Sequence, residues 1–175
     1  PMTDLFKKVT DSQDVFKKLA SHIPGFSGYI ERQNRRAADK LMRETIADRF
    51  QEQWTRASEL QTDMINNGMI AYVDDMERAT IQMRTFIDKI RTASYGYSGL
   101  FDAVKINEDE LAQLYAFDQG FFLAVEEIGR ALDNVEASLN DEAGLPAAIR
   151  NLTTLARQST EAFGRRSEVF TGSEG

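Results

Sequence analysis

The feature that most constrains the fold is a series of long segments with few helix-breaking residues. Residues 29–67 contain neither glycine nor proline, and three further long segments contain few of either. Apolar residues within these segments recur at alternating spacings of three and four, as Met83, Ile87 and Ile90 do. This spacing places them on one face of an α-helix, which turns once in about 3.6 residues. The sequence therefore predicts an all-α protein.

Glycine, proline and asparagine divide the chain into four long helical segments. They are predicted at residues 29–67, 69–95, 107–140 and 146–170. Asn67-Gly68 is typical of a helix stop, Asn107 of an N-cap, and Pro146 of a first helical turn. Since short turns favour antiparallel neighbours, we expect an up-down antiparallel bundle of four long helices. The predicted organisation is an amphipathic N-terminal helical segment at 1–23, the bundle at 24–170 and a disordered tail at 171–175.

Composition excludes several classes of protein. The 175 residues include no cysteine and a single histidine, which excludes disulfides, thiolate nucleophiles and sites built from two imidazoles of one chain. The formal net charge of −7 argues against binding to duplex nucleic acid, which requires a basic surface. No apolar run reaches the roughly 18–20 residues of a membrane span, and the N-terminal residues lack the apolar core of a secretory leader. We therefore expect a cytoplasmic protein.

The N-terminal segment is the first candidate for binding. On a helix its apolar residues form one face, which consists of Leu5, Phe6, Val9, Phe16, Leu19 and Ile23. Such a face docks on the bundle or on a partner, or it lies on a membrane surface. Asp4 and Asp14 lie on the opposite, polar face and weaken attraction to anionic lipid, so docking is the favoured interpretation.

A basic stripe at the start of the first long segment is the second candidate. Its members, at near-helical spacing, are Arg32, Arg35, Arg36, Lys40 and Arg43. One interpretation is ion pairing within the helix and with the acidic third segment. The other is recognition of an acidic partner, a phosphate group or an anionic lipid. The stripe is too short for sequence-specific readout of nucleic acid.

The third long segment is the most acidic part of the chain. From Asp102 to Glu142 it carries eleven carboxylates and two basic residues, and most of the carboxylates lie outside the apolar register. Asp118 is the exception, because it lies in register with Leu114 and Phe121. A buried carboxylate requires a partner, so we expect Asp118 to form a buried pair with an arginine of another helix.

Catalytic signals are weak throughout the sequence. Asp74-Asp75-Met76-Glu77 is similar to the aspartate-rich motifs of all-α enzymes that act on diphosphates, but no second carboxylate cluster has matching spacing. His22 has no neighbouring acid or nucleophile and is expected to be a capping or surface residue. There is no nucleophile elbow, P-loop or dinucleotide fingerprint. We predict no catalytic residue, no metal site and no cofactor.

Three stretches resemble a pattern in uncharacterised bacterial helical-bundle proteins. They are Ile23-Pro-Gly-Phe-Ser-Gly-Tyr-Ile-Glu-Arg, Arg35-Arg-Ala-Ala-Asp-Lys-Leu and Asp102-Ala-Val-Lys-Ile-Asn. The resemblance covers most of the chain and implies a bacterial, cytoplasmic protein, but it implies no activity. The layout of an amphipathic helix before long helices is also similar to that of phage-shock-type membrane-remodelling proteins.

Together these features favour a non-enzymatic helical bundle that acts as an adaptor or self-assembling interaction module, with a coiled-coil-like core. Its expected partner is another protein or a second copy, and no small-molecule substrate is indicated. One alternative is a peripheral membrane protein, and a second is a carboxylate-metal-dependent phosphoanhydride hydrolase. Aromatic residues at the helix junctions are expected to plug the bundle end or to form a contact patch, with plugging favoured; they are Phe26, Tyr29, Tyr95, Tyr97 and Phe101.

Overall fold

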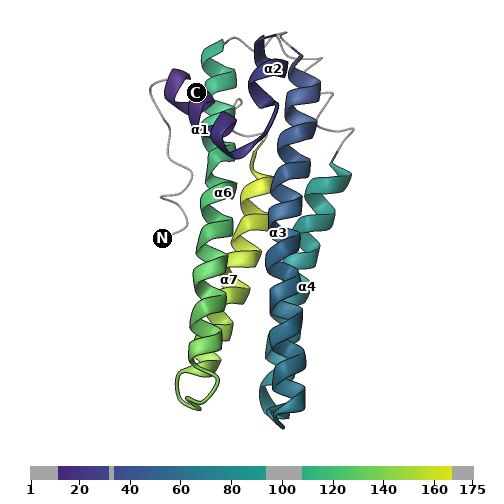
Figure 1. Cartoon of the computed structure of the whole chain (residues 1–175), viewed down its shortest axis with the longest axis vertical. Helices are drawn as coiled ribbons and strands as arrows, with labels where there is room; N and C mark the ends of the chain where they lie inside the picture. Colours follow the sequence, from purple (N-terminus) through teal and green to yellow (C-terminus); the bar gives the residue numbers. More distant parts are fainter. Residues whose placement is uncertain (1–11, 32–33, 94–107, 167–175) are drawn as a thin grey trace.

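A computed structural model describes residues 12–31, 34–93 and 108–166, and within these ranges the chain is helical with short turns and no strand. The described helices are α1 (Ser12–His22), α2 (Phe26–Glu31), α3 (Arg35–Asn66), α4 (Ile70–Thr92), α6 (Glu108–Ala137) and α7 (Leu145–Gly164) (Figure 1). The all-α prediction is confirmed. None of these helices combines the length and the apolar character needed to cross a bilayer. The tail at 171–175 lies outside the described residues.

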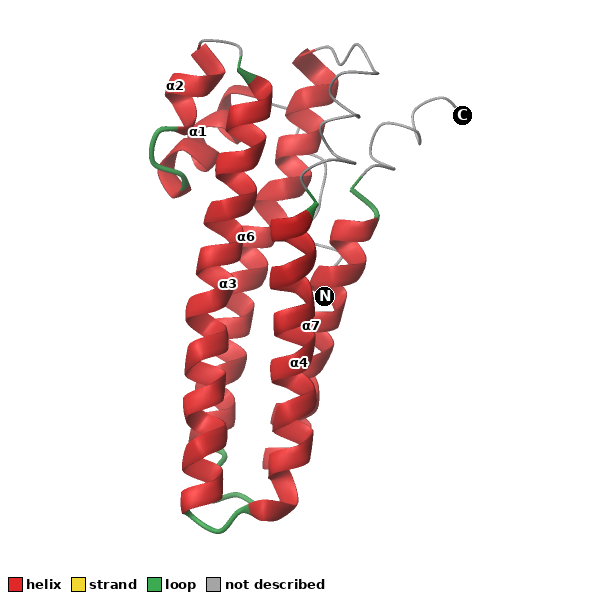
Figure 2. Cartoon of the chain, turned by 90° about the vertical axis from the view of Figure 1, so that its right-hand side faces the viewer, coloured by secondary structure: helices red, strands yellow, loops and turns green. Residues whose placement is uncertain are grey.

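The four long helices form two antiparallel hairpins, α3–α4 and α6–α7, which pack side by side (Figures 1 and 2). Direction alternates along the chain, as an up-down bundle requires. Across the hairpins, however, α4 lies parallel to α7 and α3 lies parallel to α6, so not every pair of neighbours is antiparallel. Fifteen residues separate Thr92 from Glu108, and a connection of that length need not join adjacent helices.

The predicted helix at 29–67 is divided in two. A short helix, α2, ends at Glu31, and α3 begins at Arg35. The side-chain oxygen of Asn34 accepts a hydrogen bond of 3.2 Å from the backbone N–H of Ala37, which caps α3. No glycine or proline marks this break. The local signal is Asn34 itself, because asparagine is among the strongest N-cap residues.

Replacing Asn34 by alanine is expected to lower the free energy of unfolding by about 1 kcal/mol, because the N–H of Ala37 loses its partner. Urea unfolding measures the change. Asn151, an exposed residue inside α7, is the matched control. Asn151→Ala should leave stability unchanged or raise it slightly, since alanine is the better helix former. An equal loss in both variants would contradict the capping role.

The core contains an aromatic layer to which each long helix contributes one phenylalanine. The layer consists of Phe50 from α3, Phe86 from α4, Phe121 from α6 and Phe163 from α7, all buried. Phe86 is central, with ring centroids 4.2 Å from Phe50, 5.7 Å from Phe121 and 6.4 Å from Phe163. The layer therefore joins both hairpins in one hydrophobic core.

The short helix α1 packs against α6 near one end of the bundle. Val15, Leu19 and Ile23 are fully buried there, and half-buried Phe16 places its ring 5.6 Å from that of Tyr115, edge to face. The described part of the amphipathic face thus lies on the chain's own bundle. The other predicted members of that face, Leu5, Phe6 and Val9, lie outside the described residues.

The two hairpin turns lie together at the opposite end of the bundle (Figure 1). At the α3–α4 turn, Gly68 has φ of +73°, a left-handed conformation that glycine adopts without steric cost. At the α6–α7 turn, the Asp141 carboxylate accepts a hydrogen bond of 3.1 Å from the N–H of Ala143, and Pro146 lies in the first turn of α7. Two tight turns therefore form the surface of this end.

Candidate functional site

Directly next to the aromatic layer, the bundle contains a buried ionic layer. Its members are Asp39 and Arg43 of α3, Asp118 of α6, and Arg166, which follows α7. Arg166 donates from Nε and Nη2 to the two carboxylate oxygens of Asp118, both at 2.5 Å, and from Nη2 to Asp39 at 2.8 Å. The other oxygen of Asp39 accepts a bond of 2.9 Å from Nε of Arg43.

The ionic layer ties all four long helices together. Arg43 also donates through Nη1 to the carbonyl oxygen of Ile90 on α4, at 3.3 Å. Asp118 lies one turn before Phe121, and Arg166 lies one turn after Phe163, so the ionic layer follows the register of the aromatic layer. The two layers together fix how the hairpins align along the bundle axis.

Burial dominates the electrostatics of this layer. Arg166 is 0% exposed and Asp118 is 1% exposed. Burial raises the pKa of the Asp118 carboxyl well above its usual range; the charge of Asp39 adds to this rise, and Arg43 opposes it. Burial lowers the pKa of Arg166 to about 10, so its guanidinium is still protonated at neutral pH. With both carboxylates ionised, the two guanidinium charges balance them.

The hydrogen bonds within the ionic layer limit what its carboxylates can bind. Both oxygens of Asp118 accept from Arg166, and the oxygens of Asp39 are shared between Arg43 and Arg166. These carboxylates are therefore engaged as ion-pair partners. We assign the layer the role of holding the helices in register, not of binding a ligand.

The predicted basic stripe does not form as a continuous exposed row of cations. Arg36 and Lys40 are exposed, and Lys40 pairs with Glu44 at 3.9 Å. Arg35 is the first residue of α3, and its side chain is not described. Arg32 lies outside the described residues.

The structure contradicts the predicted basic stripe most clearly at Arg43, because this residue is buried. It lies seven residues before Phe50, in the same heptad register, and this register turns it into the core. Its carboxylate partner, Asp39, belongs to its own helix. The acidic helix α6 instead pairs with Arg56, which donates to Asp133 at 2.6 Å and to Glu136 at 3.0 Å.

Other residues singled out in the sequence have packing or ion-pairing roles. Phe26 is buried, with its ring 5.4 Å from that of Tyr115, and Tyr29 is half-buried against the core. The His22 ring stacks on Phe122 with centroids 4.9 Å apart. Asp75 of the acidic motif pairs with Arg78 at 2.7 Å. The junction aromatics Tyr95, Tyr97 and Phe101 lie outside the described residues.

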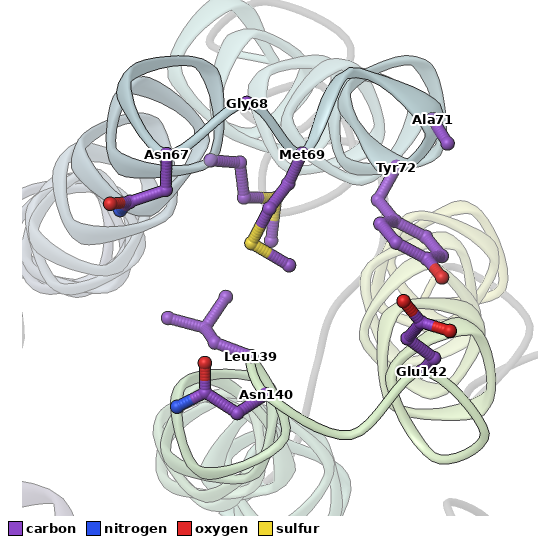
Figure 3. A pocket seen from close by; sticks show the side chains of 9 residues that line it. Asn67, Gly68, Met69, Ala71, Tyr72, Leu139, Asn140 and Glu142 are labelled. Carbon is purple, nitrogen blue, oxygen red and sulfur yellow. The ribbon is translucent and has the colours of Figure 1, made fainter.

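An open pocket of about 850 Å³ lies between the two hairpin turns. It is lined by Met64, Asn67, Gly68, Met69, Ala71 and Tyr72 of the first hairpin and by Leu139, Asn140 and Glu142 of the second. Figure 3 shows Met69 and Leu139 pointing toward one another across the pocket, with Tyr72 and Glu142 at one side of it. The hollow thus has a mixed lining, in which Met69 and Leu139 are accompanied by the polar side chains of Asn67, Asn140 and Glu142.

Exposed apolar side chains adjoin this pocket. In the part of the chain that the structure describes, three large hydrophobic residues are exposed: Ile65 at 49%, Ile70 at 64% and Ile81 at 54%. Ile65 follows Met64, and Ile70 lies between Met69 and Ala71, so two of the three flank the α3–α4 turn. We call the pocket together with Ile65 and Ile70 the bundle-end surface; it is the candidate functional site.

Comparisons with known proteins provide no relative for this chain. It matches no protein-family model, no curated protein and no solved structure. The resemblance to bacterial helical-bundle proteins is therefore still an expectation.

Proposed function

We propose that this chain is a non-enzymatic interaction module that associates with a second copy through the bundle-end surface. The observation that carries the proposal is the presence of two projecting isoleucines beside an open pocket at the same end of one molecule. Burying exposed apolar side chains is the main driving force of protein association. Clustered exposed hydrophobic residues therefore mark a contact surface.

The arrangement suits a two-fold symmetric contact. In such a contact the same surface of both copies meets, so a projecting group and a hollow on one molecule can face their counterparts on the other. Ile65 and Ile70 supply the projecting groups, and Met69 and Leu139 line the hollow. A second copy can therefore cover the exposed Ile65 and Ile70 of the first copy with its own bundle-end surface.

In the part of the chain that the structure describes, the two alternative functions draw on residues that are already engaged. The apolar face of α1 that would meet a membrane has Val15, Leu19 and Ile23 buried on the bundle. Asp118, the carboxylate that would serve a metal-dependent hydrolase, has both oxygens bonded to Arg166. The residues that these two alternatives would use therefore already have partners within the chain. Self-association instead uses the bundle-end surface, where Ile65 and Ile70 are exposed.

The test is the solution mass of the full chain and of two charge-insertion variants. Ile70→Glu is expected to weaken the dimer at least a hundredfold, because each of the two copies loses a buried isoleucine worth about 1.5 kcal/mol or more. Ile81 lies on the same helix and is similarly exposed, but it lies away from the turn. Ile81→Glu is therefore the matched control.

Light scattering should give a mass near twice 19.8 kDa for the unmodified chain and for Ile81→Glu, and 19.8 kDa for Ile70→Glu. Circular dichroism should show the same helicity in all three. Glu142 and Asp141 place negative charge near the surface, so added salt should strengthen association by screening their repulsion. A monomeric unmodified chain, or equal loss in both variants, would reject the proposal.

A further inference from the structure

A groove of about 290 Å³ runs between the parallel helices α4 and α7, and it shares no lining residue with the bundle-end pocket. It is lined by Asp75 and Arg78 of α4 and by Ile149, Arg150, Thr153, Thr154 and Arg157 of α7. The polar residues of α7 are spaced at i, i+3, i+4 and i+7, so one face of this helix presents two arginines and two threonines. Buried Ile149 is the apolar member of the lining.

The groove is locally cationic although the chain carries a net charge of −7. Three guanidinium groups line it against one carboxylate, that of Asp75. Asp75 pairs with Arg78 at 2.7 Å, and Arg157 lies 3.7 Å from Glu161 of its own helix. The side chain of Arg150 makes no ion pair or hydrogen bond with any described residue. A guanidinium has five N–H donors, so each of the three retains donors for a ligand.

The threonines add hydroxyl groups at the centre of the face. Thr153 donates its hydroxyl to the carbonyl oxygen of Ile149 at 3.1 Å. Thr154 is half-buried, and its hydroxyl makes no hydrogen bond to another residue of the described chain. The hydroxyl of Thr154 is therefore available as a neutral donor between Arg150 and Arg157.

We propose that this groove binds the phosphate or diphosphate group of a small ligand. Arginine recognises phosphate oxygens through paired N–H donors, and a hydroxyl between two arginines completes a set of donors for a tetrahedral anion. Arg150 and Arg157 are separated by about 10 Å along the helix axis, given a rise of ~1.5 Å per residue. That length suits one or two phosphate groups and is far shorter than the track needed for a nucleic-acid backbone. This inference is independent of self-association.

Isothermal titration of the full chain with inorganic phosphate and with pyrophosphate, at constant ionic strength, tests the proposal. We expect saturable binding of pyrophosphate, with inorganic phosphate binding more weakly because it reaches fewer of the three arginines. Arg150→Gln should weaken pyrophosphate binding by at least about tenfold, since it removes charge-assisted hydrogen bonds. Thr154→Val keeps the shape of the side chain and should cause a smaller loss.

Arg130→Gln is the matched control, because it removes the same charge from an exposed position on α6. It should change pyrophosphate binding by less than about twofold, and all variants should keep the solution mass of the unmodified chain. Absence of saturable binding to both anions would overturn the proposal. Equal weakening by Arg150→Gln and Arg130→Gln would also overturn it. That result would show that the anions respond to the overall charge of the chain and do not bind in the groove.

Discussion

Arg166→Met is expected to lower the free energy of unfolding by about 3–5 kcal/mol at neutral pH, the cost of leaving a buried charge without its partner. In this variant Asp39 and Asp118 face one another with a single remaining guanidinium, that of Arg43. Both carboxylates are buried, so water cannot replace the lost bonds. Urea unfolding followed by circular dichroism measures the loss.

The loss should depend on pH with a definite sign. Burial raises the pKa of Asp118 in the folded state above its value in the unfolded chain. Between these two values the folded state binds a proton that the unfolded state does not, so raising the pH through this window lowers stability. Without the hydrogen bonds from Arg166 the ionised form of folded Asp118 is less favourable still, so the pH window becomes wider. Arg166→Met should therefore be less destabilised at pH 5 than at pH 7.

Two controls separate charge burial from lost packing. Arg166→Met combined with Asp118→Leu leaves one carboxylate and one guanidinium, Asp39 and Arg43, and should recover most of the lost stability. Arg165 is the exposed neighbour in sequence, and Arg165→Met should change stability by less than about 0.5 kcal/mol. A double variant no more stable than Arg166→Met would contradict the balanced ionic layer.

The second large effect is expected in the aromatic layer, where Phe86→Ala should cost about 3–5 kcal/mol. The Phe86 ring contacts one ring from each of the other long helices, so truncation leaves a cavity at the centre of the bundle. Phe86→Leu, which retains most of the volume, should cost less than about 1.5 kcal/mol. Urea unfolding of both variants is the measurement. A loss below about 1 kcal/mol for Phe86→Ala would show that the rings do not form the packed centre.

Much of the fold could be predicted from heptad spacing. The segment predicted at 69–95 is observed as α4 from Ile70 to Thr92, because apolar register and the stop at Gly68 are both local signals. The heptad spacing does not predict the break at Asn34, since a capping residue without glycine or proline gives a weaker signal inside an otherwise helical run. The parallel packing of α4 with α7 is a tertiary property that no local pattern carries.

Part of the buried ionic layer could also be predicted from the heptad register. Asp118 stands out as a charge in an apolar register, and Arg166 follows Ser159 and Phe163 at the same spacing, so its burial could have been predicted in the same way. The prediction for Arg43 is wrong, because its spacing from the exposed cations of α3 suggests a surface position, whereas the core register that it shares with Phe50 buries it.

The bundle-end pocket could not be predicted from the sequence alone. Met69 and Leu139 belong to different hairpins, and their approach depends on how the two turns align at one end of the molecule. The groove between α4 and α7 is an intermediate case. The spacing of Arg150, Thr153, Thr154 and Arg157 is visible in the sequence, but the contribution of Arg78 from α4 depends on the packing of the two helices.

Small-angle X-ray scattering of the unmodified chain tests the central claim, that copies associate through the bundle-end surface. The 32 residues of α3 give one bundle a length of about 48 Å at ~1.5 Å per residue. Two copies joined at the turn end should form an elongated dimer close to twice as long as one bundle. Particles of dimer mass with the length of a single bundle, or monomers at every concentration, would contradict the account.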